Sequence, residues 1–390
     1  MSKTLQDYAT LINDTIQSNE INHYITTDNM CQNLGGIDTF KNINIPQGKV
    51  RSFQKDDVLL SNIRLYFRKV YRAKQKGGCS SDVLVFRAKH IDSATLFAIL
   101  SSQIFTDYAC SGSQGSKMPR GNKTHMMDFK IPTINFTIAK IFNSIQNKIE
   151  NNHKINELLH KILELLYEQY FVRFDFLDEN NKPYQTSGGK MKFSKELNRL
   201  IPNDFEVKTL GELITWISGS QPPKSCHIYE YKEGYIRFIQ NRDYSSNDYI
   251  TYIPISKNNK ICYQYDIMID KYGEAGAVRF GLQGAYNVAL SKISVINQSM
   301  QEYIRSYLNS KPIKKYLSNA CMASTRSSLN ENHIYSLMLP IPPINLLQKY
   351  EKIAKNIITA IINNNQSTQT LTALRDFLLP LLLKQQVKPK

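Results

Sequence analysis

Two long stretches of the chain repeat apolar residues at steps of three and four, which is the spacing of an amphipathic helix. One stretch starts at Ile131 and the other at Ile341, and both open with the sequence Ile-Pro-Xaa-Ile-Asn. Proline is tolerated where a helix starts and disfavours helix just upstream. The pattern therefore predicts two long helices, each of about 35 residues and about 50 Å.

The apolar positions of both helices fall on a narrow stripe that is typical of a coiled-coil seam. In the first helix the stripe consists of Ile134, Ile138, Ile141, Ile145, Ile155, Leu159, Ile162 and Leu166. In the second it consists of Leu347, Tyr350, Ala354, Ile357, Ile361, Leu371, Leu374 and Leu378. Polar Asn152 interrupts the first stripe, and Asn364 and Thr368 interrupt the second at the matching place. We expect the asparagines to set register and partner choice; the alternative is that both face solvent on a slightly rotated helix.

The likeness between the two halves of the chain extends beyond these helices. "DDVLLS" from Asp56 resembles "YDIMID" from Tyr265, and "HMMDFKIP" from His125 resembles "HIYSLMLP" from His333. A sequence that repeats over such a long period indicates two similar structural units. Each unit is predicted to end in one of the long helices.

The segments before the helices mix strand and helix patterns. Apolar runs typical of strands cover residues 57–63, 82–88, 235–239, 266–273 and 288–296. Helical patterns cover 93–109 and 297–310, and a short helix is expected near 194–200.

The predicted fold class is α+β, with two similar domains that each have a curled, mostly antiparallel sheet. A pair of long antiparallel coiled-coil helices is expected to separate them with pseudo-two-fold symmetry. The predicted segments are 1–130 (first domain), 131–175 (first long helix), 176–204 (connector), 205–339 (second domain) and 340–383 (second long helix).

Charge indicates the class of partner. The chain has 390 residues, 42% of them hydrophobic, and a net charge of +16. Such a balance favours a polyanionic partner, either nucleic acid or an anionic membrane surface, although a basic protein without such a partner is the alternative. The longest apolar run near the C-terminus, at 377–383, is too short to span a bilayer, and the first residues lack the apolar core of a signal peptide. We therefore expect a soluble, cytoplasmic protein.

The common catalytic and metal-binding patterns are missing from the sequence. The six cysteines are scattered without the spacing of a zinc site, so no metal is expected and the thiols are predicted to be reduced. "SGGKM" at Ser187 lacks the upstream glycine and the hydroxyl residue of a phosphate-binding loop, and no serine elbow or zinc-protease motif occurs. The sequence therefore predicts a binding protein with no catalytic residues.

Basic, polar and aromatic side chains gather in a few segments that are predicted to be loops. In the first domain these segments start at Ser61 and Gly112, and in the second they start at Tyr235, Asp270 and Met322. Lys and Arg neutralise phosphates, while Arg, Asn and Gln read base edges. Any one of these residues could be a solvated surface charge, but the set predicts DNA contacts. The candidate DNA-binding residues are Arg64, Tyr66, Lys69, Arg72, Gln114, Lys117, Arg120, Asn122, Lys123, Arg237, Gln240, Arg242, Lys271, Tyr272, Arg279 and Arg326.

Over nearly its full length the chain resembles a type I restriction-modification specificity subunit. The connector "FDFLDENNKPYQTSGGKMKFSKELNRLIPNDFEVKTLGEL" from Phe174 is the most specific match. "IPQGKVRSFQKDDVLLSNIRLYFRKV" and "YDIMIDKYGEAGAVRFGLQGAYNVAL" are similar to two recognition-domain types, and "RDFLLPLLLKQQV" is similar to the family's usual ending. The helix entries keep the family's proline but lack the Glu-Gln pair that normally follows it.

This resemblance implies how the chain would work. Each α+β domain would be a target recognition domain for one half of an interrupted double-stranded DNA site, and the helix pair would set the gap. Two methyltransferase subunits, and restriction subunits in turn, would assemble on the chain. S-adenosylmethionine would be bound by the partners for adenine methylation, and no cofactor by this chain. The alternatives are a coiled-coil nucleic-acid-binding or architectural protein without restriction partners, and a recognition fragment of a fused enzyme that binds cofactor itself.

Overall fold

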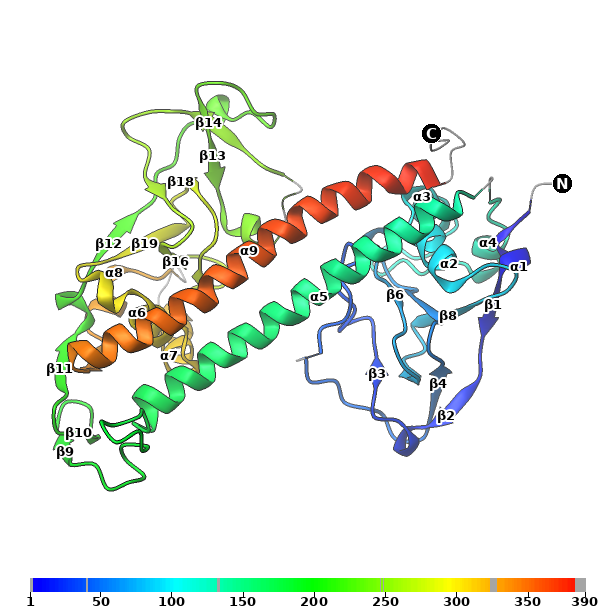
Figure 1. Ribbon diagram of the computed structural model, residues 1–390. Coiled ribbons are helices and arrows are strands. Elements are labelled where there is room, and N and C mark those ends of the chain that lie inside the picture. The colour runs from blue at the N-terminus through cyan, green and yellow to red at the C-terminus, as the bar shows by residue number, and fades with distance from the viewer. Residues whose placement is uncertain are drawn as a thin grey trace. The chain divides into compact units, whose positions relative to one another are not determined.

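The computed structural model describes residues 3–39, 41–131, 134–245, 247, 249–322 and 328–382 (Figure 1). The chain divides into two compact units, which we describe separately. Unit 1 consists of Met1–Ile155 with Asn364–Lys390, and unit 2 consists of Asn156–Asn363. The two long helices, α5 (Phe136–Tyr167) and α9 (Ile344–Leu382), each contribute one part to each unit.

Unit 1 is built on two four-stranded sheets with strand orders β1-β8-β5-β6 and β2-β4-β7-β3. Neighbouring strands are antiparallel except β3 and β7, which are parallel. The elements of unit 1 besides the long helices are α1 (Leu5–Tyr8), β1 (Ala9–Ile12), β2 (Thr15–Gln17), β3 (Tyr24–Ile25), β4 (Lys49–Phe53), β5 (Val58–Ser61), β6 (Val70–Arg72), β7 (Gly77–Cys79), β8 (Val83–Ala88), α2 (Ser93–Leu100), α3 (Gln103–Ser111) and α4 (Lys123–Met127).

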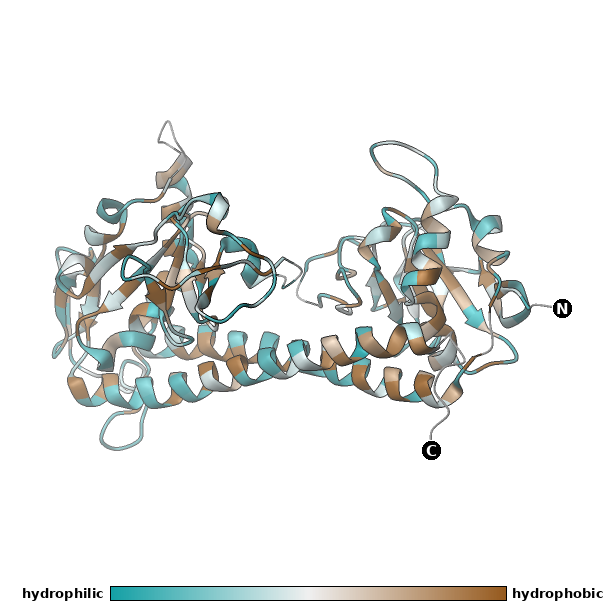
Figure 2. Cartoon of the chain, turned by 90° about the horizontal axis from the view of Figure 1, so that it is seen from above, coloured by the Kyte–Doolittle hydropathy of each residue, from teal (hydrophilic) through white to brown (hydrophobic). Residues whose placement is uncertain are grey.

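The central strands of unit 1 are buried on both faces. Along β5, Val58 and Leu60 pack into a core shared with α2, α3 and α5, whereas Leu59 packs into a second core with Phe53 of β4. Successive side chains of a strand point to opposite faces, so a strand covered on both sides reads as a continuous apolar run. This packing explains the uninterrupted patterns of β5 and β8, and strands in general carry more hydrophobic residues than loops (Figure 2).

The helical pattern at 93–109 forms two helices rather than one. Asp92 caps α2 by accepting a hydrogen bond from the Thr95 N–H (2.9 Å). Ser102 then caps α3, since its hydroxyl accepts from the Phe105 N–H (3.2 Å) and donates to the Ile99 carbonyl (2.7 Å). Serine side chains that bond nearby backbone favour helix starts over helix interiors. The Ser101-Ser102 pair therefore ends one helix and starts the next.

Unit 2 contains two four-stranded sheets with orders β12-β19-β16-β17 and β14-β13-β18-β15, and the two-stranded pairs β9-β10 and β11-β20. Here β13 and β18 are parallel and the other neighbours are antiparallel. The elements of unit 2 are β9 (Met191–Ser194), β10 (Arg199–Pro202), β11 (Glu206–Thr209), β12 (Ile214–Ser218), β13 (Tyr235–Ile239), β14 (Tyr252–Pro254), β15 (Ile261–Cys262), β16 (Ile267–Asp270), β17 (Val278–Arg279), β18 (Gly284–Tyr286), β19 (Leu290–Val295), α6 (Gln301–Asn309), α7 (Lys311–Met322), α8 (Glu331–Tyr335) and β20 (Met338–Ile341).

The two units are structural repeats, as the sequence predicted. β12, β19, β16 and β17 of unit 2 take the places that β1, β8, β5 and β6 take in unit 1. A further repeat, "TLQDYATLI" and "TLGELITWI", was not recognised in the sequence. Thr4 and Thr209 each form a capping box with an acidic residue three positions later. Leu5 and Leu210, which follow them, are both fully buried. Each unit is thus an α+β fold built on the same plan.

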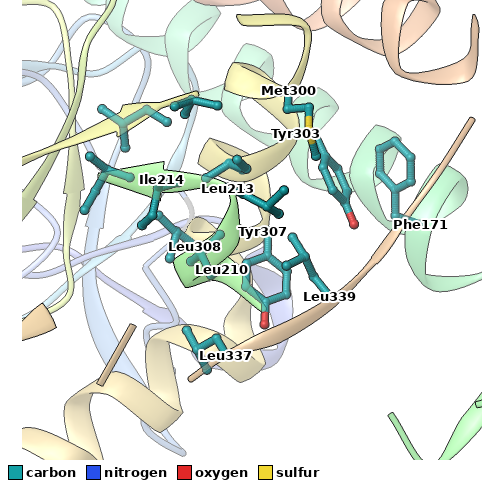
Figure 3. Packing of buried hydrophobic residues seen from close by; sticks show 14 of the residues in the cluster. Phe171, Leu210, Leu213, Ile214, Met300, Tyr303, Tyr307, Leu308, Leu337 and Leu339 are labelled. Carbon is teal, nitrogen blue, oxygen red and sulfur yellow. The ribbon is translucent and has the colours of Figure 1, made fainter. Parts of the chain in front are cut away.

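Aromatic residues fill the core of unit 2 where the long helices join it (Figure 3). The Tyr303 ring on α6 lies 4.5 Å from the Phe171 ring, and the Phe171 ring lies 4.8 Å from the Tyr350 ring on α9. All three side chains are fully buried. Tyr303 donates its hydroxyl proton to the Pro340 carbonyl of β20, so the cluster ties α6, α9 and the β11-β20 pair together.

The helix seam is only partly the one predicted. In unit 1 the Asn152 amide is buried and donates to the Thr368 hydroxyl of α9 (3.1 Å), which confirms a polar contact at this seam position. However, Ile141, Ile155, Ile162 and Leu374 of the predicted stripes are exposed. The helices pack on globular cores as well as on each other, so their buried faces follow the 3.6-residue period and are wider than a heptad seam. Both helices carry more hydrophobic residues toward their ends and mostly hydrophilic residues near the middle (Figure 2).

The short helix expected at 194–200 is wrong, because these residues lie in the β9-β10 hairpin. Arg199 pairs with Ser194, and residues 195–198 form the turn. Asn198 adopts a left-handed conformation (φ 49°), which asparagine tolerates better than most residues. The Ser194 hydroxyl, which would have capped a helix, instead accepts from the Leu197 N–H within the turn (3.2 Å).

Glu351 of α9 makes the stability of unit 2 sensitive to pH. Its carboxylate accepts a hydrogen bond from the Glu302 N–H at the start of α6 (2.9 Å), close to the buried Glu302–Arg305 ion pair. Burial raises the pKa of Glu351 to about 7, with the nearby Glu302 carboxylate adding to the effect. A carboxyl group whose pKa is higher in the folded state favours folding when it is protonated, and this contribution is lost as the pH rises through the folded pKa.

We expect Glu351→Gln to remove this pH dependence, because the amide oxygen still accepts from Glu302 and carries no charge. Relative to the variant, the wild type should lose about 1 to 3 kcal/mol of unfolding free energy between about pH 5 and about pH 8, after allowing for solvent screening. Urea unfolding followed by the fluorescence of Trp216, the only tryptophan and a residue of β12, measures this in unit 2. Parallel pH profiles for the two proteins would contradict the assignment.

Candidate nucleic-acid interface

Two candidate loops of unit 1, far apart in sequence, lie side by side. Ile63 and Arg120 form an antiparallel bridge, and the Arg64 N–H donates to the Pro119 carbonyl (2.9 Å). The Gly121 N–H donates to the Asn62 carbonyl (3.2 Å). These contacts join the segment after β5 to the segment before α4. The candidates on the two joined segments are Arg64, Tyr66, Gln114, Lys117, Arg120, Asn122 and Lys123.

Several of these side chains are available to a ligand. Tyr66 is 53% exposed, and Gln114, Lys117 and Lys123 are exposed. The Arg120 side chain is 62% exposed although it pairs with Asp82 (2.9 Å). An exposed ion pair of this kind is worth little, so a phosphate can compete for the guanidinium. The loop pair therefore presents cations, an amide and an aromatic ring together.

Other candidates of unit 1 have contacts within the protein. Lys69 donates to the Thr27 carbonyl (2.5 Å), and burial lowers its pKa. Arg72 pairs with Asp56 (3.6 Å) and lies opposite Val58, at the other end of β5 from Arg64. Asn122 caps α4 by accepting from the His125 N–H (3.1 Å). The structure thus separates Arg72 from the loop pair, engages the Lys69 side chain with Thr27, and gives Asn122 a structural role within the loop pair.

In unit 2 the turns after β13 and β16 also meet. The Asn241 amide, in the turn after β13, donates to the Tyr272 carbonyl in the turn after β16 (3.2 Å). This contact brings the segment with Gln240 and Arg242 next to the segment with Lys271 and Tyr272. The Arg242 side chain is 52% exposed and lies 5.9 Å from the centre of the Tyr249 ring. Unit 2 therefore also combines cations, amides and aromatic rings at one surface.

Two further candidates of unit 2 have partners within the protein, and a third lies outside the described residues. Arg237 donates to the Asn247 side chain (2.8 Å). Arg279 is held by Asp270 (2.9 Å) and Glu274 (2.5 Å), and burial raises the pKa of Asp270 although Arg279 opposes the shift. Arg279 therefore neutralises a buried carboxylate within the fold. Arg326 lies outside the described residues.

The segments after β5 and after β16 occupy equivalent places in the repeat. In unit 1 the Gly121 N–H binds the carbonyl of Asn62, just after β5. In unit 2 the Leu329 N–H binds the carbonyl of Lys271, just after β16 (3.0 Å). Buried polar atoms without a partner among the described residues also gather at both places; they include Asn62 Oδ1, Arg64 Nε, Arg237 Nε, Asn241 Oδ1 and Tyr244 OH. Buried polar groups are rarely left unpaired, and such groups often mark functional sites.

Exposed tyrosines of unit 2 were missed by the sequence reasoning. Tyr229 and Tyr231 are each 71% exposed, and Tyr249 is 70% exposed. They lie near the β13-β14 edge, where Tyr231 contacts Tyr252 with ring centres 5.7 Å apart. Alternation of tyrosine with charge in "YEYKEGY" was the available signal, but it does not show which rings reach solvent.

The described residues contain neither a membrane-spanning helix nor a metal-binding cluster. No helix among them has the length and apolar character needed to cross a membrane. Across the same residues, no group of three or more His, Cys, Asp or Glu side chains is placed to hold a metal ion. The interface therefore has to be interpreted from its cations, amides and aromatic rings.

Comparison with known proteins supports the family resemblance. Residues 202–373 match the family model described as type I restriction modification DNA specificity domain. The type I restriction enzyme MjaIX specificity subunit of Methanocaldococcus jannaschii is 25% identical over 300 residues, which are 74% of this chain and 67% of that protein. The HindI specificity subunit of Haemophilus influenzae is 21% identical over 306 residues, which are 64% of this chain and 66% of that protein.

A solved structure has the same fold. The type I restriction-modification S subunit from M. genitalium matches with a TM-score of 0.63 at 15% identity, over 98% of this chain and 96% of that one. The fold of two similar α+β units with long helices is thus shared with a specificity subunit. Taken together, the family model over residues 202–373 and the relatives support the resemblance to type I restriction-modification specificity subunits, and the solved structure shows that the fold is shared.

Proposed function

We propose that the chain reads an interrupted duplex DNA site, with unit 1 contacting one half and unit 2 the other. The loop surface of each unit is the observation that carries this proposal, because the segment after β5 in unit 1 and the equivalent segment after β16 in unit 2 both contribute to it with different side chains. Unit 1 offers Arg64, Gln114 and Arg120, whereas unit 2 offers Gln240, Arg242 and Lys271. Two surfaces that share one equivalent segment and differ in their side chains suit the reading of two different half-sites.

The chemistry of these side chains fits both parts of DNA recognition. Lysines and arginines bind phosphates and position the protein, while bidentate Arg, Asn and Gln side chains read base edges in the major groove. Exposed tyrosines supply apolar and stacking contacts. In the proposed complex this chain supplies recognition and no catalytic group. Two methyltransferase subunits dock on it and bind S-adenosylmethionine for adenine methylation, and restriction subunits join that core.

The long helices have a separate role in this proposal. Because α5 and α9 each belong to both units, their length contributes to the spacing between the two half-sites. The polar contact between Asn152 and Thr368 keeps the helices in one register within unit 1. A fixed register is needed if the gap in the DNA site is to be constant.

We expect the full chain to bind duplex DNA with a steep salt dependence and to transfer no methyl group by itself. About six phosphate contacts would reduce affinity roughly 10³-fold between about 50 and about 200 mM salt, because counterions are released on binding. Fluorescence anisotropy with a labelled duplex measures the slope, and co-purification tests assembly with a methyltransferase subunit. Methyl transfer by the chain alone, or DNA affinity that is insensitive to salt, would contradict the proposal.

A further inference from the structure

A buried polar network in unit 1 links both long helices to the loop at residues 64–68. Arg375 of α9 is only 1% exposed, although an arginine is rarely buried without several partners. It donates to the Asn33 carbonyl (3.2 Å), the Gln146 amide oxygen of α5 (3.2 Å) and the Asp376 carboxylate (3.0 Å). Gln146 is equally buried and donates to the carbonyl of Leu34 (2.5 Å). Both helices therefore bind the same short segment, residues 33–34.

That segment has an unusual backbone. Asn33 and Leu34 are two consecutive residues other than glycine in the left-handed region, with φ of 51° and 60°. This conformation is unfavourable for a residue with a β-carbon, above all for leucine, and persists only where surrounding contacts impose it. The carbonyls of both residues are the groups that Arg375 and Gln146 bind. The polar network is thus placed to stabilise the strained turn.

The turn at residues 33–34 also binds the candidate DNA-reading loop at residues 64–68. The Asn33 N–H donates to the Phe67 carbonyl (2.9 Å), and the Leu34 N–H donates to the Arg68 carbonyl (3.1 Å). The loop itself is strained, because Arg64 and Arg68 at its two ends are also left-handed (φ 50° and 49°). Asp376 approaches the Arg68 guanidinium directly (4.0 Å), so α9 contacts the loop by a second route. The presentation of Arg64 and Tyr66 depends on this backbone.

Unit 2 has apolar residues at the corresponding helix positions. When Asn152 is aligned with Asn364, Gln146 aligns with Ile358 and Arg375 aligns with Leu163. Ile358 is buried and Leu163 packs against the main core of unit 2, so both positions are apolar there. An apolar pair is thus sufficient for packing the helices in a unit of this fold. The polar pair of unit 1 needs another explanation.

We infer that Arg375 and Gln146 are positioning residues for DNA reading by unit 1. They hold the turn at residues 33–34, and this turn holds the loop at residues 64–68 in the conformation that presents Arg64 and Tyr66. Their contribution is selectivity at one half-site, without contact with DNA. This inference rests on the proposed function. It adds two residues, Arg375 and Gln146, that lie on the long helices and outside the candidate loops.

The test replaces the polar pair of unit 1 by the apolar pair of unit 2. In Gln146→Ile with Arg375→Leu, both side chains that donate to the turn are replaced together, so neither is left buried without the other, and the Asn33 and Leu34 carbonyls lose these donors. Removal of one member alone would leave an unpaired buried group. The matched control is Leu374→Gln, which changes the exposed neighbour of Arg375 on the same helix. Thermal unfolding establishes that each variant is folded.

The measurement is competition binding of the full chain to duplexes that carry its methylated site, as mapped in the genome of cells that express it. One base pair is exchanged in either half. We expect the double variant to lose about tenfold of its discrimination at the half-site read by unit 1. It should keep its discrimination at the other half, and its Asn33 and Leu34 amides should exchange hydrogen faster. Unchanged discrimination, an equal loss at both halves, or failure of the double variant to fold would overturn the inference.

Failure of this inference is distinguishable from failure of the proposed function. If the wild-type chain does not discriminate between these duplexes, the proposed function is wrong whatever the variant does. If the wild type discriminates at both halves and the folded double variant does so equally well, only the positioning role is overturned.

Discussion

Arg64→Ala is expected to abolish most of the discrimination at the half-site read by unit 1. Arg64 lies at the start of the joined loops, its Nε has no partner among the described residues, and its guanidinium makes a long hydrogen bond to the Lys117 carbonyl (3.4 Å). A bidentate arginine–guanine contact is worth about 1 to 3 kcal/mol, so discrimination should fall roughly 5- to 150-fold. Competition binding with duplexes altered in one half measures this loss.

Two further variants show whether Arg64 contacts a base or a phosphate. Arg64→Lys keeps the charge but loses the planar fork, so it should restore overall affinity without restoring discrimination. Arg242→Ala, in unit 2, should affect only the other half-site. If Arg64→Ala weakens binding to all duplexes by the same factor, Arg64 is a phosphate contact and not a base reader.

Tyr303→Ala is expected to destabilise unit 2 by about 3 to 5 kcal/mol, the range for truncating a large buried aromatic residue. The side chain is fully buried, and its ring packs against Phe171 (4.5 Å) and Tyr167 (6.2 Å). Urea unfolding followed by Trp216 fluorescence reports on this unit selectively. Tyr303→Phe is the matched control, since it keeps the ring and loses only the hydrogen bond to Pro340, at a cost of about 1 kcal/mol. Equal effects of the two substitutions would show that the hydroxyl, not the packing, is decisive.

The strands that could be predicted from the sequence are those buried on both faces. β5 (Val58–Ser61) and β8 (Val83–Ala88) fall within the predicted ranges 57–63 and 82–88, because Val58–Leu60 and Val83–Phe86 are continuous apolar runs. The second sheet was missed in unit 1 and was predicted in unit 2 only at β13, since strands such as β7 (Gly77–Cys79) consist largely of glycine and are too short to show a period. A β-carbon at Gly78 would lie 2.5 Å from the Ile21 side chain, so close packing explains the glycine there. Such a contact is not visible in a local pattern.

The helix seam shows a similar limit. Leu374 fitted the predicted stripe, yet it is exposed while the neighbouring Arg375 is buried. Arg375 is the buried one of the two because it binds the Asn33 carbonyl and the Gln146 side chain, which lie far away in sequence. A heptad pattern assumes that a helix packs only against another helix, whereas α9 packs on whole units.

The candidate interface was predictable as a set of loops but not as a surface. Arg64 and Arg120 were both selected from basic, polar segments, and the bridge between Ile63 and Arg120 brings these segments together. Arg72 came from the same segment as Arg64, but strand pairing places it at the other end of β5. Charge and residue type identify the segments, whereas hydrogen bonds between distant loops decide which residues meet.

The central claim is that each unit reads its own half-site, and a domain exchange tests it most directly. Residues 1–130 are replaced by those of another specificity subunit with a different site, and methylated adenines are mapped across the genome of cells that express the chimera with its partner subunits. A second chimera exchanges residues 205–339. The account predicts that each chimera changes one half of the methylated site, a different half in each case, and leaves the gap unaltered. If one exchange changed both halves of the site, the claim would be contradicted.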